Sequence, residues 1–195
     1  MDRDCDPDLV TRLKAGDTGA FDAVYADLHP RLFGFLARLS RRRDVAEDLA
    51  EETWLRLVAH IPRLADDTRL APWLFTVARN LYVSYCRSRL VDYEARASLH
   101  LWPERQIEPS PFEMASASQL QQQVEVALAA LPGPYREALL LVAFEGMTPS
   151  EAAEICGVSG EAMRQRLSRA RAMLAKRLDG SAAALGHPVL NEVVP

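Results

Sequence analysis

Apolar residues recur every three or four positions along almost the whole chain, which is the spacing of one face of an α-helix. Phe21, Val24, Tyr25 and Leu28 illustrate this spacing in the first part of the chain. No segment shows a convincing alternation of apolar and polar residues, the pattern that is typical of a half-buried strand. The sequence therefore predicts an all-α fold.

A proline-bearing stretch divides the predicted helices into two groups. Pro103, Pro109 and Pro111 interrupt any helix between residues 98 and 118, where Ser, Glu and Gln are frequent. We therefore predict two small helical domains, residues 1–97 and 119–180, joined by a flexible linker at residues 98–118. Residues 181–195 show no sustained period and are expected to form a poorly ordered tail.

Prolines also mark the starts of individual helices. Pro72 is well placed in a first helical turn, so a helix is expected over residues 72–89. Its apolar face is predicted to carry Trp73, Val77 and Leu81. After a turn at residues 132–134, a further helix is expected from residue 135 to about residue 144.

Composition excludes several classes of protein. No apolar run approaches the roughly 18 residues that a membrane span needs, and acids stand at the N-terminus where a secretory signal would be basic. Cys5, Cys86 and Cys156 are far apart, and the four histidines are scattered. Neither a disulfide framework nor a metal site nor a histidine-based catalytic site is therefore expected. We predict a cytoplasmic protein without cofactor, without metal and without catalytic residues.

Charge is segregated along the chain, although the net charge is only -4. Acidic residues dominate the first 30 positions, whereas residues 160–178 carry many basic residues against Glu161 alone. Phosphate neutralisation supplies most non-specific affinity for DNA. This distribution therefore suits a protein whose affinity for DNA is weak until a partner brings it there.

The segment from residue 148 onward has the pattern of a helix-turn-helix. Thr148 is a predicted N-cap, and Glu151 three residues later completes a capping box. Gly157 permits the sharp reversal of the chain, and Val158 is expected to be buried in that turn. Ser159 is predicted to cap the second helix.

The second of these helices presents a polar and basic face. With a buried stripe of Met163, Leu167, Ala170 and Leu174, the outward residues near its start are Glu161, Arg164, Gln165 and Ser168, flanked by Arg166, Arg169 and Arg171. Forked Arg and Gln donors match guanine and adenine edges, and the flanking arginines suit phosphates. We interpret the helix as one that reads the major groove; the alternative is a solvated basic helix of an ordinary bundle.

Together the two predicted domains resemble the extracytoplasmic-function (ECF, group IV) sigma factors of bacterial RNA polymerase. The resemblance covers about residues 9–178 and rests on GDTGAFDAVYADLHPRLFGFLARL, DVAEDLAEETWLRL, APWLFTVARNLYVSYCRSR and ALAALPGPYREALLLVAFEGMTPSEAAEICGVSGEAMRQRLSRAR, in that order. It implies that region 2, the first domain, binds core polymerase and melts the promoter, and that region 4 reads the −35 element. Where the family commonly has Gly-Thr-Val-Lys, this chain has residues 161–164, so the resemblance implies no particular −35 sequence.

The resemblance also implies residue roles. A core polymerase surface is expected at Asp48, Glu51, Glu52, Trp54 and Leu55, and capture of the −10 strand at Arg79, Asn80, Val83, Arg87 and Arg89. The loop at residues 66–71 would line a base pocket, whereas the spacing of Trp73 favours a core position over base stacking. For the acidic residues, the alternative is an ordinary solvated helical face. Another basic edge, Arg38, Arg41, Arg42 and Arg43, could meet DNA or polymerase, and the sequence favours neither.

The implied function is an alternative sigma factor, a non-catalytic initiation subunit. Its expected partners are the β′ clamp helices and the β flap of core polymerase, promoter DNA and an anti-sigma factor, with no insertion into the membrane. Two other hypotheses remain open. One is a helix-turn-helix regulator that acts without polymerase, and the other is a sigma-like decoy that sequesters an anti-sigma factor.

Overall fold

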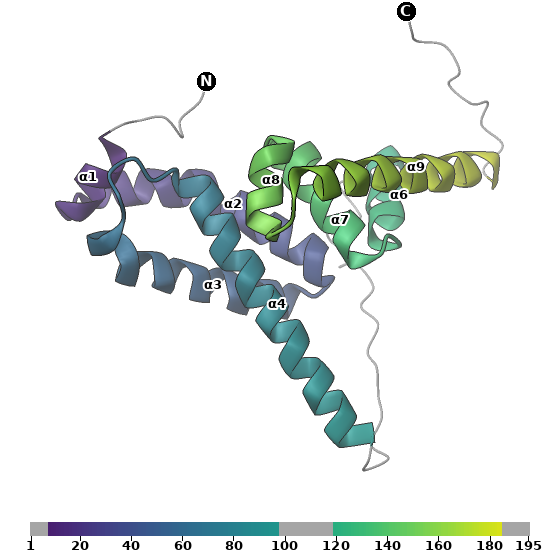
Figure 1. Cartoon of the computed structure of the whole chain (residues 1–195), viewed down its shortest axis with the longest axis horizontal. Coiled ribbons are helices and arrows are strands. Elements are labelled where there is room, and N and C mark those ends of the chain that lie inside the picture. The colour runs from purple at the N-terminus through teal and green to yellow at the C-terminus, as the bar shows by residue number, and fades with distance from the viewer. Residues whose placement is uncertain (1–7, 98–118, 185–195) are drawn as a thin grey trace, which may run out of the picture. The chain divides into compact units, whose positions relative to one another are not determined.

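The structure, a computed structural model, describes residues 8–97 and 119–184 (Figure 1). Every regular element in these two ranges is a helix. The helices are α1 (Leu9–Lys14), α2 (Thr18–Ser40), α3 (Arg43–His60), η2 (Ile61–Arg63), α4 (Leu70–Ala97), α6 (Gln119–Ala129), α7 (Gly133–Leu139), η3 (Leu140–Phe144), α8 (Pro149–Cys156) and α9 (Gly160–Ala184). The chain divides into two compact units, formed chiefly by α1–α4 and by α6–α9. The predicted all-α fold with two domains is therefore confirmed.

The first unit is a cluster in which α2, α3 and α4 pack against one another and α1 packs on α2. Its centre contains fully buried side chains from all three long helices, including Leu32, Phe35, Leu57 and Phe75. The rings of Phe35 and Phe75 meet edge to face, with centroids 5.3 Å apart. Burial of each such side chain contributes about 1.5–3 kcal/mol, so this shared core holds the three helices together.

Helix α2 has a polar cap at its start and an unusual residue at its end. The amide of Ala20 donates to Oδ1 of Asp17 at 3.1 Å, and this bond, together with Arg12, lowers the pKa of Asp17. After Ser40, the backbone of Arg41 has a φ of 57°, in the left-handed region. The hydroxyl of Tyr82 in α4 donates to the carbonyl of Leu39 at 3.2 Å, so α4 is fastened to the end of α2.

In the second unit, α6 and α7 pack against α9. The buried guanidinium of Arg136 donates to the carbonyl oxygens of Leu128, Ala129 and Leu131, at 3.2, 2.9 and 2.8 Å. The last carbonyls of a helix have no partner within that helix. Arg136 therefore binds carbonyls at the end of α6 and just after it, and it ties α7 to α6.

Several predicted boundaries were wrong by a few residues. Helix α4 extends from residue 70 to residue 97 rather than over 72–89, and α7 begins at Gly133, with its prolines at the cap and in the first turn. The predicted helix up to residue 144 continues as a π-helix. Helix α9 continues to residue 184, beyond the predicted end of the second domain at residue 180. The predicted linker at 98–118 and residues 185–195 of the predicted tail lie outside the described residues.

Candidate nucleic-acid and protein interfaces

Helices α8 and α9 form the predicted helix-turn-helix. The amide of Glu151 donates to Oγ1 of Thr148 at 3.2 Å, and the amide of Thr148 donates to Oε2 of Glu151 at 2.7 Å, which completes the capping box. Gly157 has a φ of +63°, a conformation that glycine adopts without strain. The amide of Ala162 donates to Oγ of Ser159 at 3.1 Å, so Ser159 caps α9 as predicted. Val158, which we expected to be buried in the turn, is only half-buried.

Helix α9 buries one side and exposes the other as predicted. Met163, Leu167 and Ala170 are buried, whereas Leu174 is half-buried near the end of the packed part of the helix. The exposed residues are Glu161, Arg164, Gln165, Ser168, Arg169 and Arg171. Arg166 differs, because a helical period of 3.6 residues places it at the edge of the buried stripe, where it is half-buried.

The two residues predicted to read bases share one acidic partner. Nη2 of Arg164 lies 2.7 Å from Oε2 of Glu161, and Nε2 of Gln165 donates to Oε1 of Glu161 at 3.2 Å. The hydrogen bond from Arg164, then that from Gln165, lowers the pKa of Glu161. The carboxylate is therefore charged throughout the neutral range and holds both forked side chains at the start of α9. The i,i+3 and i,i+4 spacing was a visible signal for these bonds.

Helix α4 groups four of the five residues predicted to capture a DNA strand. Asn80, Val83 and Arg87 follow one side of the helix, and Nη1 of Arg79 lies 3.5 Å from Oδ1 of Asn80. Asn80 and Arg87 are exposed, and Arg79 and Val83 are half-buried. Arg89 is exposed but lies elsewhere, because the helical period places it on the side of α4 that carries Tyr82.

The segment before α4 contributes less than we predicted. Leu70 and Ala71 belong to the first turn of α4 and are buried, so only residues 66–69 of the predicted pocket loop reach the surface. Trp73, which we expected in the core, is half-buried, and its ring stacks on that of His60 with centroids 5.5 Å apart. Its position on α4 points it toward the end of α3 rather than toward the helix cluster.

Helix α3 presents the predicted acidic surface. Asp48 and Glu51 are exposed beside Leu55, whose exposed fraction is 58%, and Glu52 is half-buried and paired with Arg56 at 2.8 Å. Trp54 was wrongly placed on this surface, since it is only 6% exposed. The helical period turns Trp54 toward α2, whereas Leu55 stays with the carboxylates.

Trp54 forms one wall of an aromatic groove between α2 and α3 that the sequence did not indicate. Its Nε1 donates to Nδ1 of His29 at 3.1 Å, and its ring lies 4.7 Å from that of Tyr25. The groove has a volume of about 650 Å³, and its lining residues are Phe21, Tyr25, His29, Phe33, Arg43, Glu47, Glu51, Trp54, Leu55 and Val58. Phe21, Tyr25, His29 and Phe33 stand four residues apart on α2, so they follow one side of that helix.

Residues 8–97 and 119–184 show neither the side-chain clusters of a metal site nor a helix suited to span a membrane. These ranges contain no group of three or more His, Cys, Asp or Glu side chains that could hold a metal ion. None of the helices in the same ranges combines the length and the apolar character needed to cross a membrane.

Comparison with known families places both units. The Sigma-70 region 2 family matches residues 24–90, and the family described as Sigma-70, region 4 matches residues 121–174. The ECF RNA polymerase sigma factor EcfG of Rhodopseudomonas palustris (strain TIE-1) is 34% identical over 149 residues, which cover 76% of this chain and 80% of EcfG. The chain belongs to the ECF sigma factors. This ECF sigma factor is also 33% identical over 164 residues to the RNA polymerase sigma factor CarQ of Myxococcus xanthus, which covers 82% of the chain and 90% of CarQ.

Solved structures show the same architecture. The sigma factor RpoE from Bartonella quintana, solved in complex with the anti-sigma factor NepR, matches with a TM-score of 0.68 at 31% identity. The match covers 82% of this ECF sigma factor and 96% of the RpoE chain. CnrH, solved in complex with the cytosolic domain of CnrY, matches with a TM-score of 0.66 at 23% identity, over 90% of this chain and 97% of CnrH; this likeness shows the fold alone.

Membership of the family fixes the general role. This ECF sigma factor is an alternative sigma factor, a subunit that acts in transcription initiation with core RNA polymerase and promoter DNA. Region 2 corresponds to α2, α3 and most of α4, and region 4 corresponds to α6 through most of α9.

Proposed function

We propose that this sigma factor reads a −35 element with α9, captures the melted −10 strand with α4 and binds core polymerase through α3. The observation that carries the proposal is the outer face of α9, where exposed basic and amide side chains follow the turn of a complete helix-turn-helix. A helix of this kind enters the major groove with its first residues at the base edges.

On α9, Arg164 and Gln165 are the base-reading residues. Both are engaged by Glu161 in the protein alone, so binding to DNA exchanges one set of hydrogen bonds for another. The free energy gained in this exchange is largest at a base edge that matches the fork of the guanidinium and smaller at a mismatched edge. Glu161 thereby increases the discrimination between −35 sequences and lowers the overall affinity for DNA. Arg169 and Arg171 bind phosphates.

On α4, Asn80 is the residue that contacts an unstacked base. Its exposed amide offers both a donor and an acceptor, and Arg87 lies on the same side of the helix to bind the strand's phosphates. Capture of a base that has left the stack offsets the few kcal/mol that unstacking costs. The DNA therefore opens without hydrolysis of a nucleotide.

We expect Asn80→Ala to spare polymerase binding and to impair melting. Loss of one hydrogen bond of about 1 kcal/mol lowers the equilibrium constant for promoter opening roughly fivefold, and the fraction of open promoter falls accordingly. Permanganate reactivity of thymines in the −10 region measures this fraction, and co-elution with core polymerase measures binding. Open complexes equal to those of the wild type would remove Asn80 from the melting step.

On α3, Asp48, Glu51 and Leu55 form the surface for core polymerase. Two exposed carboxylates beside an exposed leucine suit a partner that is rich in arginine and has an apolar centre, such as the β′ clamp helices. The expected partner of region 4 is the β flap. Leu55 and Glu51 also line the aromatic groove, so the polymerase surface and the groove are continuous.

Leu55→Ala should weaken binding to core polymerase without destabilising region 2. Its exposed fraction of 58% limits the effect on unfolding to within about 0.5 kcal/mol, whereas loss of an apolar contact at a protein interface costs about 1 kcal/mol. Titration of labelled core polymerase measures the affinity. Ala59→Ser, an exposed change on the same helix, serves as the control, and unchanged affinity of Leu55→Ala would place the polymerase surface elsewhere.

The aromatic groove is the proposed site for an anti-sigma factor. Its aromatic and aliphatic lining, with Arg43, Glu47 and Glu51 at the rim, fits the apolar face of an amphipathic helix. The solved complex of RpoE with the anti-sigma factor NepR supports a partner of this class. A helix in the groove would cover Glu51 and Leu55 and so compete with polymerase.

Reconstitution with core polymerase tests the proposed function. The purified chain and core enzyme from the source bacterium should form a complex that initiates on genomic DNA where core enzyme alone does not. Tight, specific DNA binding by the chain alone, without dependence on polymerase, would favour the regulator hypothesis. An absence of both activities, with an effect only on an anti-sigma factor, would favour the decoy.

A further inference from the structure

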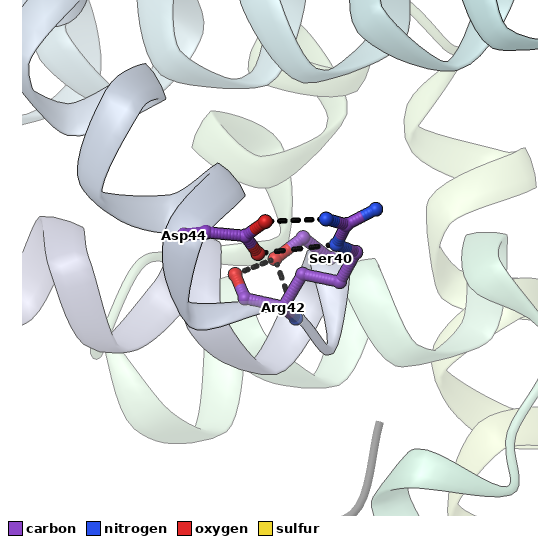
Figure 2. A network of polar contacts seen from close by, with 3 residues as sticks. All are labelled: Ser40, Arg42 and Asp44. Atoms are coloured by element: carbon purple, nitrogen blue, oxygen red, sulfur yellow. Dashed lines mark hydrogen bonds and ion pairs between the residues drawn. The ribbon is translucent and has the colours of Figure 1, made fainter. Parts of the chain in front are cut away.

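Three consecutive arginines span the turn after α2 and the first residue of α3, and two of them have acidic partners. The guanidinium of Arg42 forms a forked pair with Asp44, with Nε 3.1 Å from Oδ1 (Figure 2). Nε of Arg43 donates to Oε1 of Glu47 at 2.9 Å, and its guanidinium lies 5.8 Å from the centroid of the Phe33 ring. Arg41 is exposed and has no acidic partner among residues 8–97 and 119–184. One guanidinium of the three therefore remains available to a ligand.

The backbone of Arg41 is in a conformation that disfavours any side chain. Its φ of 57° makes it the only residue other than glycine with a positive φ in the described parts of the chain. The other positions of this kind are Gly16, Gly146 and Gly157. Glycine is the usual residue after the last turn of a helix, because a Cβ there crowds the backbone. A non-glycine residue held in this region indicates a role for its side chain.

The turn holds Arg41 in a fixed position. Oγ of Ser40 accepts a hydrogen bond from the amide of Arg42 at 3.1 Å and donates one to the carbonyl of Arg42 at 2.9 Å (Figure 2). The amide of Arg41 donates to the carbonyl of Ala37 at 2.8 Å. The backbone on both sides of Arg41 is therefore fastened, so little backbone entropy is lost when its side chain binds a ligand.

The side of α4 that contacts the end of α2 also carries an arginine. Tyr82 donates to the carbonyl of Leu39, two residues before Arg41. Tyr82, Tyr85 and Arg89 follow one side of α4 at the spacing i, i+3 and i+7, and Arg89 is exposed. Arg89 therefore lies on the side of α4 that carries Tyr82, and not on the predicted base-capture side with Asn80 and Arg87.

We propose that Arg41, with Arg89, binds the phosphate backbone of promoter DNA beside the −10 element, as a contact separate from the Asn80 side of α4. The proposal rests on the proposed function, in which α4 meets the promoter. A guanidinium suits phosphate because it is always charged and presents forked donors. Core polymerase is less complementary to Arg41 than DNA is. The exposed acids Asp48 and Glu51 on α3 suit a basic surface of polymerase, whereas Arg41 requires an acidic or anionic partner.

The substitution Arg41→Gly distinguishes a phosphate contact of the Arg41 side chain from a structural role. Glycine relieves the left-handed backbone, so the thermal midpoint of the full chain should stay equal or rise. The affinity of the holoenzyme for a promoter identified from its own transcripts should fall, and the slope of log affinity against log salt should decrease by about one. Arg41→Lys should retain the slope, Arg89→Ala should reduce it by a similar amount, and Arg43→Ala, whose charge is already paired, should leave it unchanged.

Other outcomes would contradict either the phosphate contact of Arg41 or the proposed function. If wild-type holoenzyme forms open complexes and Arg41→Gly keeps the wild-type salt slope, the phosphate contact is wrong and the proposed function stands. Weaker binding of Arg41→Gly to core polymerase, at an unchanged slope, would assign the residue to polymerase instead. A wild-type chain that forms no open complex at all would overturn the proposed function and this contact together.

Discussion

Trp54→Ala should destabilise region 2 by about 3–5 kcal/mol, the usual cost of removing a large buried aromatic side chain. Trp54 is only 6% exposed, its ring contacts those of Phe21 and Tyr25, and its Nε1 is bonded to His29. The substitution removes this contact area and leaves a cavity at the wall of the groove. It also deprives Nδ1 of His29 of its donor.

Hydrogen exchange of the full chain assigns the effect to region 2. Amides of α2 and α3 should lose protection, whereas those of α7 and α9 keep it, because the two units have separate cores. Trp54→Phe keeps the ring contacts and should cost about 1 kcal/mol for the lost hydrogen bond. Leu55→Ala, the neighbouring exposed position, should leave protection unchanged. Normal protection of α2 and α3 in Trp54→Ala would contradict the burial of this residue.

Arg164→Ala should weaken binding to the cognate promoter by about 1–3 kcal/mol and relax preference at one position of the −35 element. Arg164 is exposed near the start of α9, and its guanidinium is already directed by Glu161. Removal of the fork leaves a base edge without its partner. The loss should therefore be largest for the preferred base and small for the other three.

Affinities of holoenzyme for promoters with each base at that position measure this effect. Arg169→Ala is the matched control, because this exposed arginine flanks the outer face and should weaken all promoters equally. Equal weakening of all four promoters by Arg164→Ala would instead make Arg164 a phosphate contact. The −35 preference would then have to come from Gln165 or from the shape of the DNA.

Local features of the sequence predicted the helix-turn-helix well. Thr148, Glu151, Gly157 and Ser159 act on residues within four positions of themselves, so their roles follow from helix capping and turn geometry alone. The pairing of Glu161 with Arg164 carries a local signal of the same kind, the i,i+3 spacing of opposite charges on a helix. Such features need no knowledge of what the segment packs against.

The predictions that were wrong concern features that depend on packing between segments far apart in the sequence. Trp54 and Leu55 are neighbours in the sequence, and only the packing of α3 on α2 decides which of them is buried. The groove arises because Phe21 and Tyr25 lie beside the core, whereas Val24 and Leu28 lie within it, a distinction that apolar spacing does not make. The left-handed backbone at Arg41 was also invisible, since its usual signal is a glycine.

Sequencing the 5′ ends of transcripts made by core polymerase and this chain on fragmented genomic DNA tests promoter recognition most directly. We expect a discrete set of start sites that share a −10 motif and a −35 motif at fixed spacing. Arg164→Ala should alter the −35 motif alone, and Asn80→Ala should reduce yield without altering it. Start sites identical to those of core enzyme alone, or sites that share no upstream motif, would contradict the assignment of α4 and α9 to promoter DNA.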